Sequence, residues 1–314
     1  MKYIQDLRDG DKVTNEIYLC KLKQTLTGKN NRSYDSLILQ DKTGTIDGKI
    51  WDLNREIGQY DTMDFVHIDG VVRTYQDAPQ LNITRIYKAS EGEYYPEDYF
   101  PMTTKDIDSM YQEIRNFVQS VKDNYLRTLL ERFFIEDAEF VKRFSNHSAA
   151  KSVHHGFVGG LLEHTLGVTK MCDYYASNYP IINRDLLITA ALFHDIGKMD
   201  ELSSFPHNDY TDEGQLLGHI FIGASKIQEC IKSIDKFPVK LANELLHCIL
   251  AHHGELEYGS PKKPATMEAL ALHLADNTDA KIQTMTEILN NGDPKADWLG
   301  YQRLFESNIR RSSK

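Results

Sequence analysis

Histidine and aspartate residues recur inside largely apolar segments of the last two-thirds of this sequence. They are His164, the pair His194-Asp195, His219, the pair His252-His253, and Asp276. A carboxylate placed among apolar side chains is costly to bury unless it has a partner. Any fold of this chain must therefore supply partners for these side chains, and this requirement constrains the fold more than any other feature.

The same residues are the types that bind divalent metal ions. Together they supply enough imidazoles and carboxylates for two ions, with positions left open for water. Such a two-metal site is the usual apparatus for phosphoester cleavage, because it generates hydroxide and stabilises the attacking and leaving oxygens. Imidazole and carboxylate ligands suit Mn²⁺, Fe²⁺, Co²⁺ or Zn²⁺ better than Mg²⁺, which prefers oxygen ligands alone, and of these we favour Mn²⁺.

Asp195 is central to this prediction, because its two carboxylate oxygens can bridge two metal ions. The other ligands divide into two sets, one of His164, His194 and Asp276, and one of His219 with His252, His253 or both. Taken alone, the His194-Asp195 pair has another reading, a capping or salt-bridged aspartate beside a core histidine. The remaining ligand types shift the balance towards a metal site.

Two residues near the ligands are candidates for catalysis beside Asp195. Lys198 follows Asp195 by one helical turn and can neutralise a phosphate oxygen, although a lysine at a helix C-terminus also interacts favourably with the helix dipole. His155, in the pair His154-His155, can hold substrate phosphate or help protonate a leaving 3′-oxygen. Its alternative is a histidine at the start of a helix without a role.

Apolar residues at three- and four-residue spacing predict helices over most of the chain after residue 103. A helix capped by Thr103 or Thr104 runs to Val121. The other predicted helices are Asn124–Phe134, Asp137–Phe144, Leu161–Tyr175, Arg184–Ile196, Gly218–Ser233, Val239–His252 and Thr266–Leu289. Residues 298–314 form either one last helix or a loosely held arm.

Residues 1–90 have a different pattern, with short runs rich in β-branched and aromatic residues between turn signals. The predicted strands are Val13–Leu26, Ser33–Leu39, Thr45–Trp51, Met63–Tyr75 and Gln80–Tyr87. Five strands in a segment of this length suggest a small closed barrel, which removes exposed sheet edges. Residues 91–103, with two prolines and a mix of acidic and aromatic residues, read as an ordered linker.

The sequence therefore predicts a multidomain protein, with a small all-β barrel of the oligonucleotide-binding (OB) type in residues 1–90 and an all-α domain in residues 104–297. Residues 91–103 link the two, and residues 298–314 are a C-terminal tail. No apolar run is long enough to span a membrane, and the N-terminus lacks the apolar core of a secretory signal. The four cysteines have no CxxC spacing, so we expect a cytoplasmic protein with reduced thiols. A homo-oligomer is compatible with the sequence.

The net charge of −10 argues against a protein that binds nucleic acid through a generally basic surface. The charge is uneven, however, because residues 1–90 contain 13 Lys+Arg and 13 Asp+Glu. OB barrels bind single strands by stacking bases on aromatic side chains beside a positive groove. The candidates for that role are Lys21, Lys23, Lys29, Arg32 and Tyr34, while Trp51 reads as a core residue. The alternative is a basic hairpin that is merely solvated.

Two segments resemble the motifs of the HD-domain superfamily of metal-dependent phosphohydrolases: HHGFVGGLLEH at 154–164 and LFHDIGK at 192–198. Its four defining positions correspond to His164, His194, Asp195 and Asp276. The extra ligands of its two-metal members resemble His219, His252 and His253. An OB-type barrel followed by such an HD-type domain is similar to the YhaM family of bacterial 3′→5′ exoribonucleases, and this resemblance covers nearly the whole chain.

The resemblance implies a metal-dependent 3′→5′ exonuclease that releases nucleoside 5′-monophosphates from single-stranded RNA, with single-stranded DNA as a further candidate substrate. A second hypothesis is a phosphodiesterase or phosphohydrolase for a small nucleotide, in which the barrel regulates activity or assembles subunits. A third is a non-catalytic RNA-binding adaptor, which the complete ligand set disfavours. The acidity of the chain counts modestly for the second hypothesis over the first.

Overall fold

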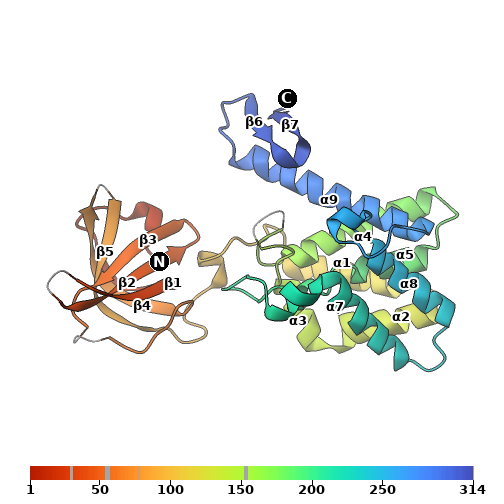
Figure 1. The fold of residues 1–314 in the computed structure, drawn as a ribbon, viewed down its shortest axis with the longest axis horizontal. Helices are drawn as coiled ribbons and strands as arrows, with labels where there is room; N and C mark the ends of the chain where they lie inside the picture. Colours follow the sequence, from red (N-terminus) through yellow and green to blue (C-terminus); the bar gives the residue numbers. More distant parts are fainter. Residues whose placement is uncertain (29–30, 54–56, 77, 152–154, 314) are drawn as a thin grey trace. The chain divides into compact units, whose positions relative to one another are not determined.

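In the computed structural model the chain divides into two compact units, Met1–Met102 and Thr103–Lys314, each with its own hydrophobic core (Figure 1). The structure describes residues 1–28, 31–53, 57–76, 78–151 and 155–313. Among these residues, no helix combines the length and the apolar character that crossing a membrane requires.

The first unit is a closed five-stranded barrel, as predicted. Its strands are β1 (Lys12–Thr27), β2 (Ser33–Asp41), β3 (Gly44–Ile50), β4 (Phe65–Tyr75) and β5 (Ala78–Lys88). They close in the order β1-β2-β3-β5-β4, and only the β3–β5 pair is parallel. Every strand therefore has two neighbours, which leaves no open sheet edge.

Residues 91–102 belong to the barrel unit. Tyr99 is buried and its hydroxyl donates a hydrogen bond to the carbonyl oxygen of Ile17, 3.0 Å away. Phe65 of β4 stacks against Tyr94, with 3.7 Å between the ring centroids. The aromatic residues of the segment predicted to be an ordered linker therefore order it by packing on the barrel.

The second unit is helical, as predicted. Its helices are α1 (Ile107–Ser120), α2 (Asn124–Glu131), α3 (Ala138–Asn146), α4 (Gly160–Asn178), α5 (Arg184–Phe193), α6 (Lys198–Glu201), α7 (Asp212–Lys232), α8 (Val239–Ala251) and α9 (Met267–Asn291). The predicted cap of the first helix is wrong. Asp106 caps α1 by accepting a hydrogen bond from the Ser109 N–H at 2.8 Å, whereas the Thr103 hydroxyl donates to Glu163.

Helix α5 is buried along its whole length from Leu186 to Phe193. Such an all-round apolar helix is stable only inside a core, and α4, α8 and α9 pack against it. All the predicted ligands except His219, which lies on α7, belong to α4 or α9 or directly follow α5 or α8. The packing of apolar faces around α5 therefore determines where the polar residues of the site meet.

The tail is neither a helix nor a loose arm. Residues 298–314 contain a hairpin of β6 (Trp298–Gln302) and β7 (Ser307–Arg310). The following Arg311 donates hydrogen bonds to the carbonyl oxygens of Leu289 and Gly292, at 2.5 and 3.1 Å. Carbonyl groups at a helix C-terminus have no partner inside the helix, so this arginine anchors the hairpin to the end of α9.

Candidate metal centre

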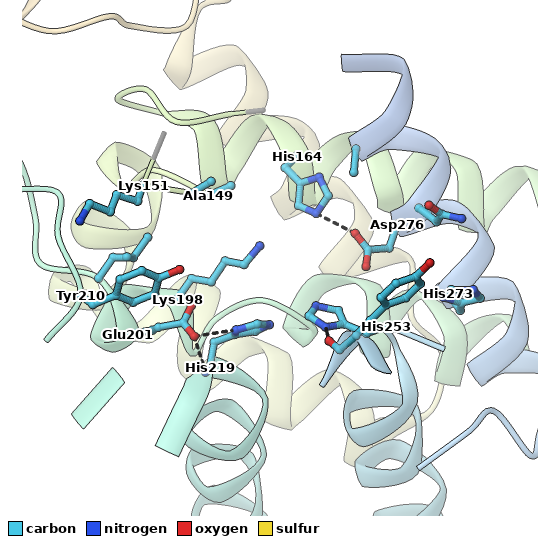
Figure 2. Close-up of a pocket in the computed structure, with 15 residues that line it drawn as sticks. Ala149, Lys151, His164, Lys198, Glu201, Tyr210, His219, His253, His273 and Asp276 are labelled. Carbon is cyan, nitrogen blue, oxygen red and sulfur yellow. Dashed lines mark hydrogen bonds and ion pairs between the residues drawn. The ribbon is translucent and has the colours of Figure 1, made fainter. Parts of the chain in front are cut away.

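The seven predicted ligands meet although they come from five helical segments. Four of them, His164, His219, His253 and Asp276, line a cavity of about 620 Å³, and the other three are buried against these four. Figure 2 shows His164 and Asp276 on one side of the cavity and His219 on the other. The ligands occupy α4 (His164), the residues after α5 (His194 and Asp195), α7 (His219), the residues after α8 (His252 and His253) and α9 (Asp276).

Asp195 lies between the two ligand sets and turns one oxygen towards each. Its Oδ2 is 3.3 Å from the Nε2 of His164 and 3.4 Å from the Nε2 of His194. Its Oδ1 is 3.6 Å from the Nε2 atoms of both His219 and His252. A carboxylate that faces two groups of nitrogens in this way has the arrangement of a bridging ligand.

The first ligand set is His164, His194 and Asp276, whose candidate ligand atoms all lie within 4.8 Å of one another. The Nε2 of His164 is 3.2 Å from the Nε2 of His194 and 3.2 Å from Oδ1 of Asp276. Two imidazole nitrogens and a carboxylate oxygen that point at one small volume suit a divalent ion.

The second set is His219, His252 and His253, which also lie within 4.8 Å of one another. Among the described residues, the buried Nε2 atoms of His219 and His252 and the Oδ1 of Asp195 have no hydrogen-bond partner. Buried polar atoms without partners are costly, and a second metal ion would satisfy all three. The donors present therefore fit a metal on this side as well.

Three ligand histidines are oriented by backbone carbonyl groups. The Nδ1 atoms of His194, His252 and His253 lie 2.7–2.8 Å from carbonyl oxygens, those of Ala191, Ile249 and Tyr258 respectively. A carbonyl oxygen can only accept, so each Nδ1 carries the proton and each Nε2 has its lone pair free for a metal.

The two remaining histidines are oriented by carboxylates that sequence reasoning missed. The Nδ1 of His164 is 2.7 Å from Oδ2 of Asp279, and the Nδ1 of His219 is 3.0 Å from Oε1 of Glu201. The backbone N–H of His219 also donates to Glu201 Oε1, because α7 is kinked at Gly218, where φ is 72°. Each ligand set thus has one histidine supported by an outer carboxylate.

Burial and charge set the protonation of the ligands. Burial lowers the pKa of His252, and burial with the neighbouring His252 lowers the pKa of His253 to about 4. Burial would raise the pKa of Asp195, but Lys198 and His194 outweigh it and hold that pKa well below its usual range. These histidines are therefore neutral and this carboxylate ionised at neutral pH, which are the forms that bind metals.

Lys198 lines the cavity, and its Nζ lies 2.7 Å from Oδ2 of Asp195. Figure 2 shows its side chain extending between His219 and His164. The alternative reading of Lys198 as a cation at a helix C-terminus is wrong, because α5 ends at Phe193 and Lys198 begins α6. Burial lowers the pKa of Lys198, but Asp195 outweighs it, so the pKa is raised and the ammonium stays charged.

His155 does not reach the cavity, so the predicted contact with substrate or leaving group is corrected. It is 2% exposed, it is absent from the described residues that line the cavity, and its Nε2 lies 3.0 Å from Oδ2 of Asp279. Asp279 in turn contacts His164, so His155 stands behind a predicted metal ligand. Its neighbour His154 lies outside the described residues.

The predicted nucleic-acid residues of the barrel have different environments. Lys21 and Arg32 are exposed, whereas Lys23 is turned onto the barrel, with its Nζ 2.9 Å from the carbonyl oxygen of Tyr60 and 4.0 Å from the Tyr60 ring centroid. Lys23 is therefore a poor candidate for a strand contact. Lys29 lies outside the described residues.

The half-buried Tyr34 stacks on the exposed Trp51. The ring centroids are 4.8 Å apart and Trp51 is 54% exposed. The expectation that Trp51 belongs to the barrel core is wrong, because its indole N–H donates to the side chain of Asn82 on the outer surface of β5. The pair offers a stacking surface at the ends of β2 and β3.

Comparison with known proteins agrees with this geometry. The family model described as "HD domain" matches residues 161–281, so the helical unit contains an HD domain, the domain of a metal-dependent phosphohydrolase family. The protein named 3′-5′ exoribonuclease YhaM of Listeria innocua is 34% identical over 301 residues, 93% of each chain. Its namesake in Bacillus subtilis is 33% identical over 290 residues, 91% of this chain and 90% of the relative. The chain belongs to the YhaM family of 3′→5′ exoribonucleases, and it is a phosphodiester hydrolase.

Proposed function

We propose that this chain is a two-metal 3′→5′ exonuclease that degrades single-stranded RNA to nucleoside 5′-monophosphates. The observation that carries the proposal is the position of Asp195, whose Oδ2 faces one set of ligands and whose Oδ1 faces the other. The names of the relatives support RNA as the substrate and the 3′ end as the starting point.

The first metal would be held by His164, His194 and Asp276, and the second by His219, His252 and His253, with Asp195 shared. We propose Mn²⁺, with Co²⁺, Fe²⁺ and Zn²⁺ as alternatives, because each set combines imidazole nitrogens with carboxylate oxygen once the shared Asp195 is counted, whereas Mg²⁺ prefers oxygen ligands alone. Two such ions, when bound, supply an activated water and positive charge for the attacking and leaving oxygens.

The chain itself would hold the scissile phosphate through Lys198. Its side chain is 15% exposed at the cavity, and its ammonium nitrogen is 2.7 Å from the shared carboxylate. A fixed cation in a site with little water stabilises a phosphate oxygen more than the same cation in solution. If the 3′-oxygen of the penultimate nucleotide leaves, the phosphate stays on the released nucleotide as its 5′-phosphate.

The cavity has the size of a site for one terminal nucleotide, since ligand pockets commonly measure about 300–1,000 Å³. Tyr210 and Lys151 form one wall of it (Figure 2). Tyr210 is exposed, and its ring can stack on a base without reading its sequence. This arrangement favours exonucleolytic removal of successive nucleotides of any identity.

The barrel would bind the strand through the stacked pair of Tyr34 and Trp51, with Lys21 and Arg32 as exposed cations nearby in sequence. Stacking of bases on aromatic side chains is largely independent of sequence, which suits an enzyme that degrades RNA of any sequence. The RNA substrate and the four free cysteines favour a cytoplasmic location.

The proposal is tested with single-stranded RNA labelled at its 5′ end, in the presence of Mn²⁺. We expect a ladder of products that shorten from the 3′ end, together with nucleoside 5′-monophosphates. Intact RNA with hydrolysis of a small nucleotide would support the alternative, a small-nucleotide phosphodiesterase with a regulatory or assembly barrel. DNA of the same sequence, tested in parallel, determines whether the substrate range includes deoxyribose, and light scattering tests for a homo-oligomer.

A further inference from the structure

Asp279 links two histidines of the helical unit through a single carboxylate oxygen. Its Oδ2 lies 2.7 Å from the Nδ1 of His164 and 3.0 Å from the Nε2 of His155. Carboxylate oxygens only accept, so each histidine donates an N–H to this oxygen. His155, Asp279 and His164 are thus joined in series by two hydrogen bonds, and His164 belongs to the first ligand set.

The fold makes room for this carboxylate on helix α4. A Cβ atom added to Gly167 would lie 2.4 Å from Oδ1 of Asp279, a distance that side chains do not adopt. Glycine in a helix interior is less favourable than alanine. The helix therefore carries an unfavourable residue at the one turn where Asp279 approaches, three residues after His164.

His155 is also held in an unfavourable conformation. Its φ is 58°, in the left-handed region that residues with a Cβ rarely adopt. Its ring is 2% exposed and one of its nitrogens bonds to Asp279. Backbone strain of this kind persists only where the surrounding structure supports it, and it clusters at functional sites.

We propose that Asp279 is a positioning residue for the metal centre. It holds the Nδ1–H of His164, so that the Nε2 of His164 stays turned towards Asp195 and Asp276, and His155 fixes Asp279 from the other side. An outer carboxylate of this kind fixes the ring and raises the basicity of a ligand histidine. Asp279 contacts neither substrate nor metal in this role, and the inference rests on the proposed metal site.

The same three side chains could instead hold an ion themselves, since their candidate atoms lie within 4.8 Å of one another. The geometry favours the positioning role. His164 would have to bind ions through both ring nitrogens at once, whereas the 2.7 Å distance to Asp279 is that of a charge-assisted hydrogen bond.

The test measures metal binding directly, by titrating the metal-free full-length protein with Co²⁺ and recording its visible absorption. Asp279→Asn removes the charge and keeps the shape, and Asp279→Ala removes the carboxylate. We expect Co²⁺ affinity to fall by about 10–100-fold, the usual cost of losing an outer partner, and the absorption bands to change. Asp173→Asn is the control, because that carboxylate pairs with Arg184 on the surface of α4.

Gly167→Ala provides a second test that leaves Asp279 itself intact. The added methyl group would displace the carboxylate while improving the helix propensity of α4. We expect weaker Co²⁺ binding with no loss of helical circular dichroism, a combination that a purely structural role of Gly167 would not produce.

Wild-type affinity and an unchanged cobalt spectrum in Asp279→Ala would overturn the inference. So would three ions per wild-type chain of which Asp279→Ala loses only one, because the cluster would then be a metal site of its own. Weakened Co²⁺ binding in a protein that leaves RNA intact would support the inference and refute the proposed function, so the two failures are distinguishable.

Discussion

The helical unit and the barrel hold their candidate binding groups in opposite ways. In the helical unit, His194, Asp195 and His252 are at most 2% exposed and face one another. In the barrel, Trp51 is 54% exposed and stacks on Tyr34 at the surface. The groups proposed for catalysis, which need a low dielectric and fixed charges, thus lie in the helical unit. The barrel instead offers a solvent-exposed surface that can adapt to its ligand.

The difference predicts how each unit responds to change. A buried polar residue whose partner is removed is left unsatisfied, which costs more than the lost bond itself. An exposed aromatic side chain loses only its own contact with a ligand. Substitutions in the helical unit should therefore act on catalysis in an all-or-none manner, and those on the barrel should act in small increments.

The largest effect is expected for Asp195→Ala. Loss of the shared carboxylate removes a ligand from both sets at once, so the variant should retain neither activity nor tightly bound metal. Exonuclease assays and elemental analysis measure the two losses, and circular dichroism checks the fold. Activity near the wild-type level would contradict the assignment of the metal centre.

Removal of residues 1–102 should strongly weaken the binding of long RNA and leave the hydrolysis of small substrates unchanged. The two units have separate cores, so the helical unit should fold and hydrolyse a small model phosphodiester at the wild-type rate. Its affinity for long single strands should fall by about 10²-fold or more, the gain that a linked second binding module provides. Equal losses on both substrates would show that the barrel contributes to chemistry.

A smaller effect is expected for Trp51→Ala. Stacking of a base on an aromatic ring contributes roughly 1–3 kcal/mol, so RNA affinity should fall by about tenfold while kcat is preserved. Trp298→Ala is the matched control, since that tryptophan is 60% exposed on the hairpin of the helical unit. An equal loss in the control would mean that the barrel pair has no special role.

The smallest effect concerns acid stability. Burial lowers the pKa of His147, although the carbonyl oxygens of Ser148 and Leu202 oppose the shift. As the pH falls, the His147 imidazole of the unfolded chain is therefore protonated before that of the folded chain. The contribution of the neutral imidazole to the free energy of unfolding is complete above about pH 6.5 and is lost as the pH falls below that value. His147→Gln should reduce the difference in melting temperature of the metal-free protein between pH 7.5 and 5.5. An unchanged difference would exclude His147 as its source.

The histidines and aspartates of the ligand sets could be predicted because polar residues stand out in apolar helices. Asp279 and Glu201 could not, since acidic residues on half-polar helix faces are ordinary and their partners lie 115 and 18 residues away in the sequence. Asp279 lies one turn after Asp276 on α9, and that spacing was the available signal.

The barrel strands were predictable from their composition, but the direction of individual side chains was not. Lys23 and Trp51 both lie in predicted strands, whose side chains alternate between the two faces of the sheet. In the structure the Lys23 side chain packs on the barrel, and the Trp51 side chain is exposed to solvent. In a small barrel the two faces of a strand have similar residues near its ends, so alternation alone does not distinguish them.

Five helical segments contribute candidate ligands to the proposed centre, so bound ions would act as cross-links between parts of the chain separated by up to 112 residues, from His164 to Asp276. A ligand that binds only the folded state stabilises it by about 2.7 kcal/mol at a concentration a hundred times its Kd. The melting temperature of the helical unit would then rise and fall with the supply of free metal. Metal scarcity would thus limit the lifetime of the enzyme as well as its rate.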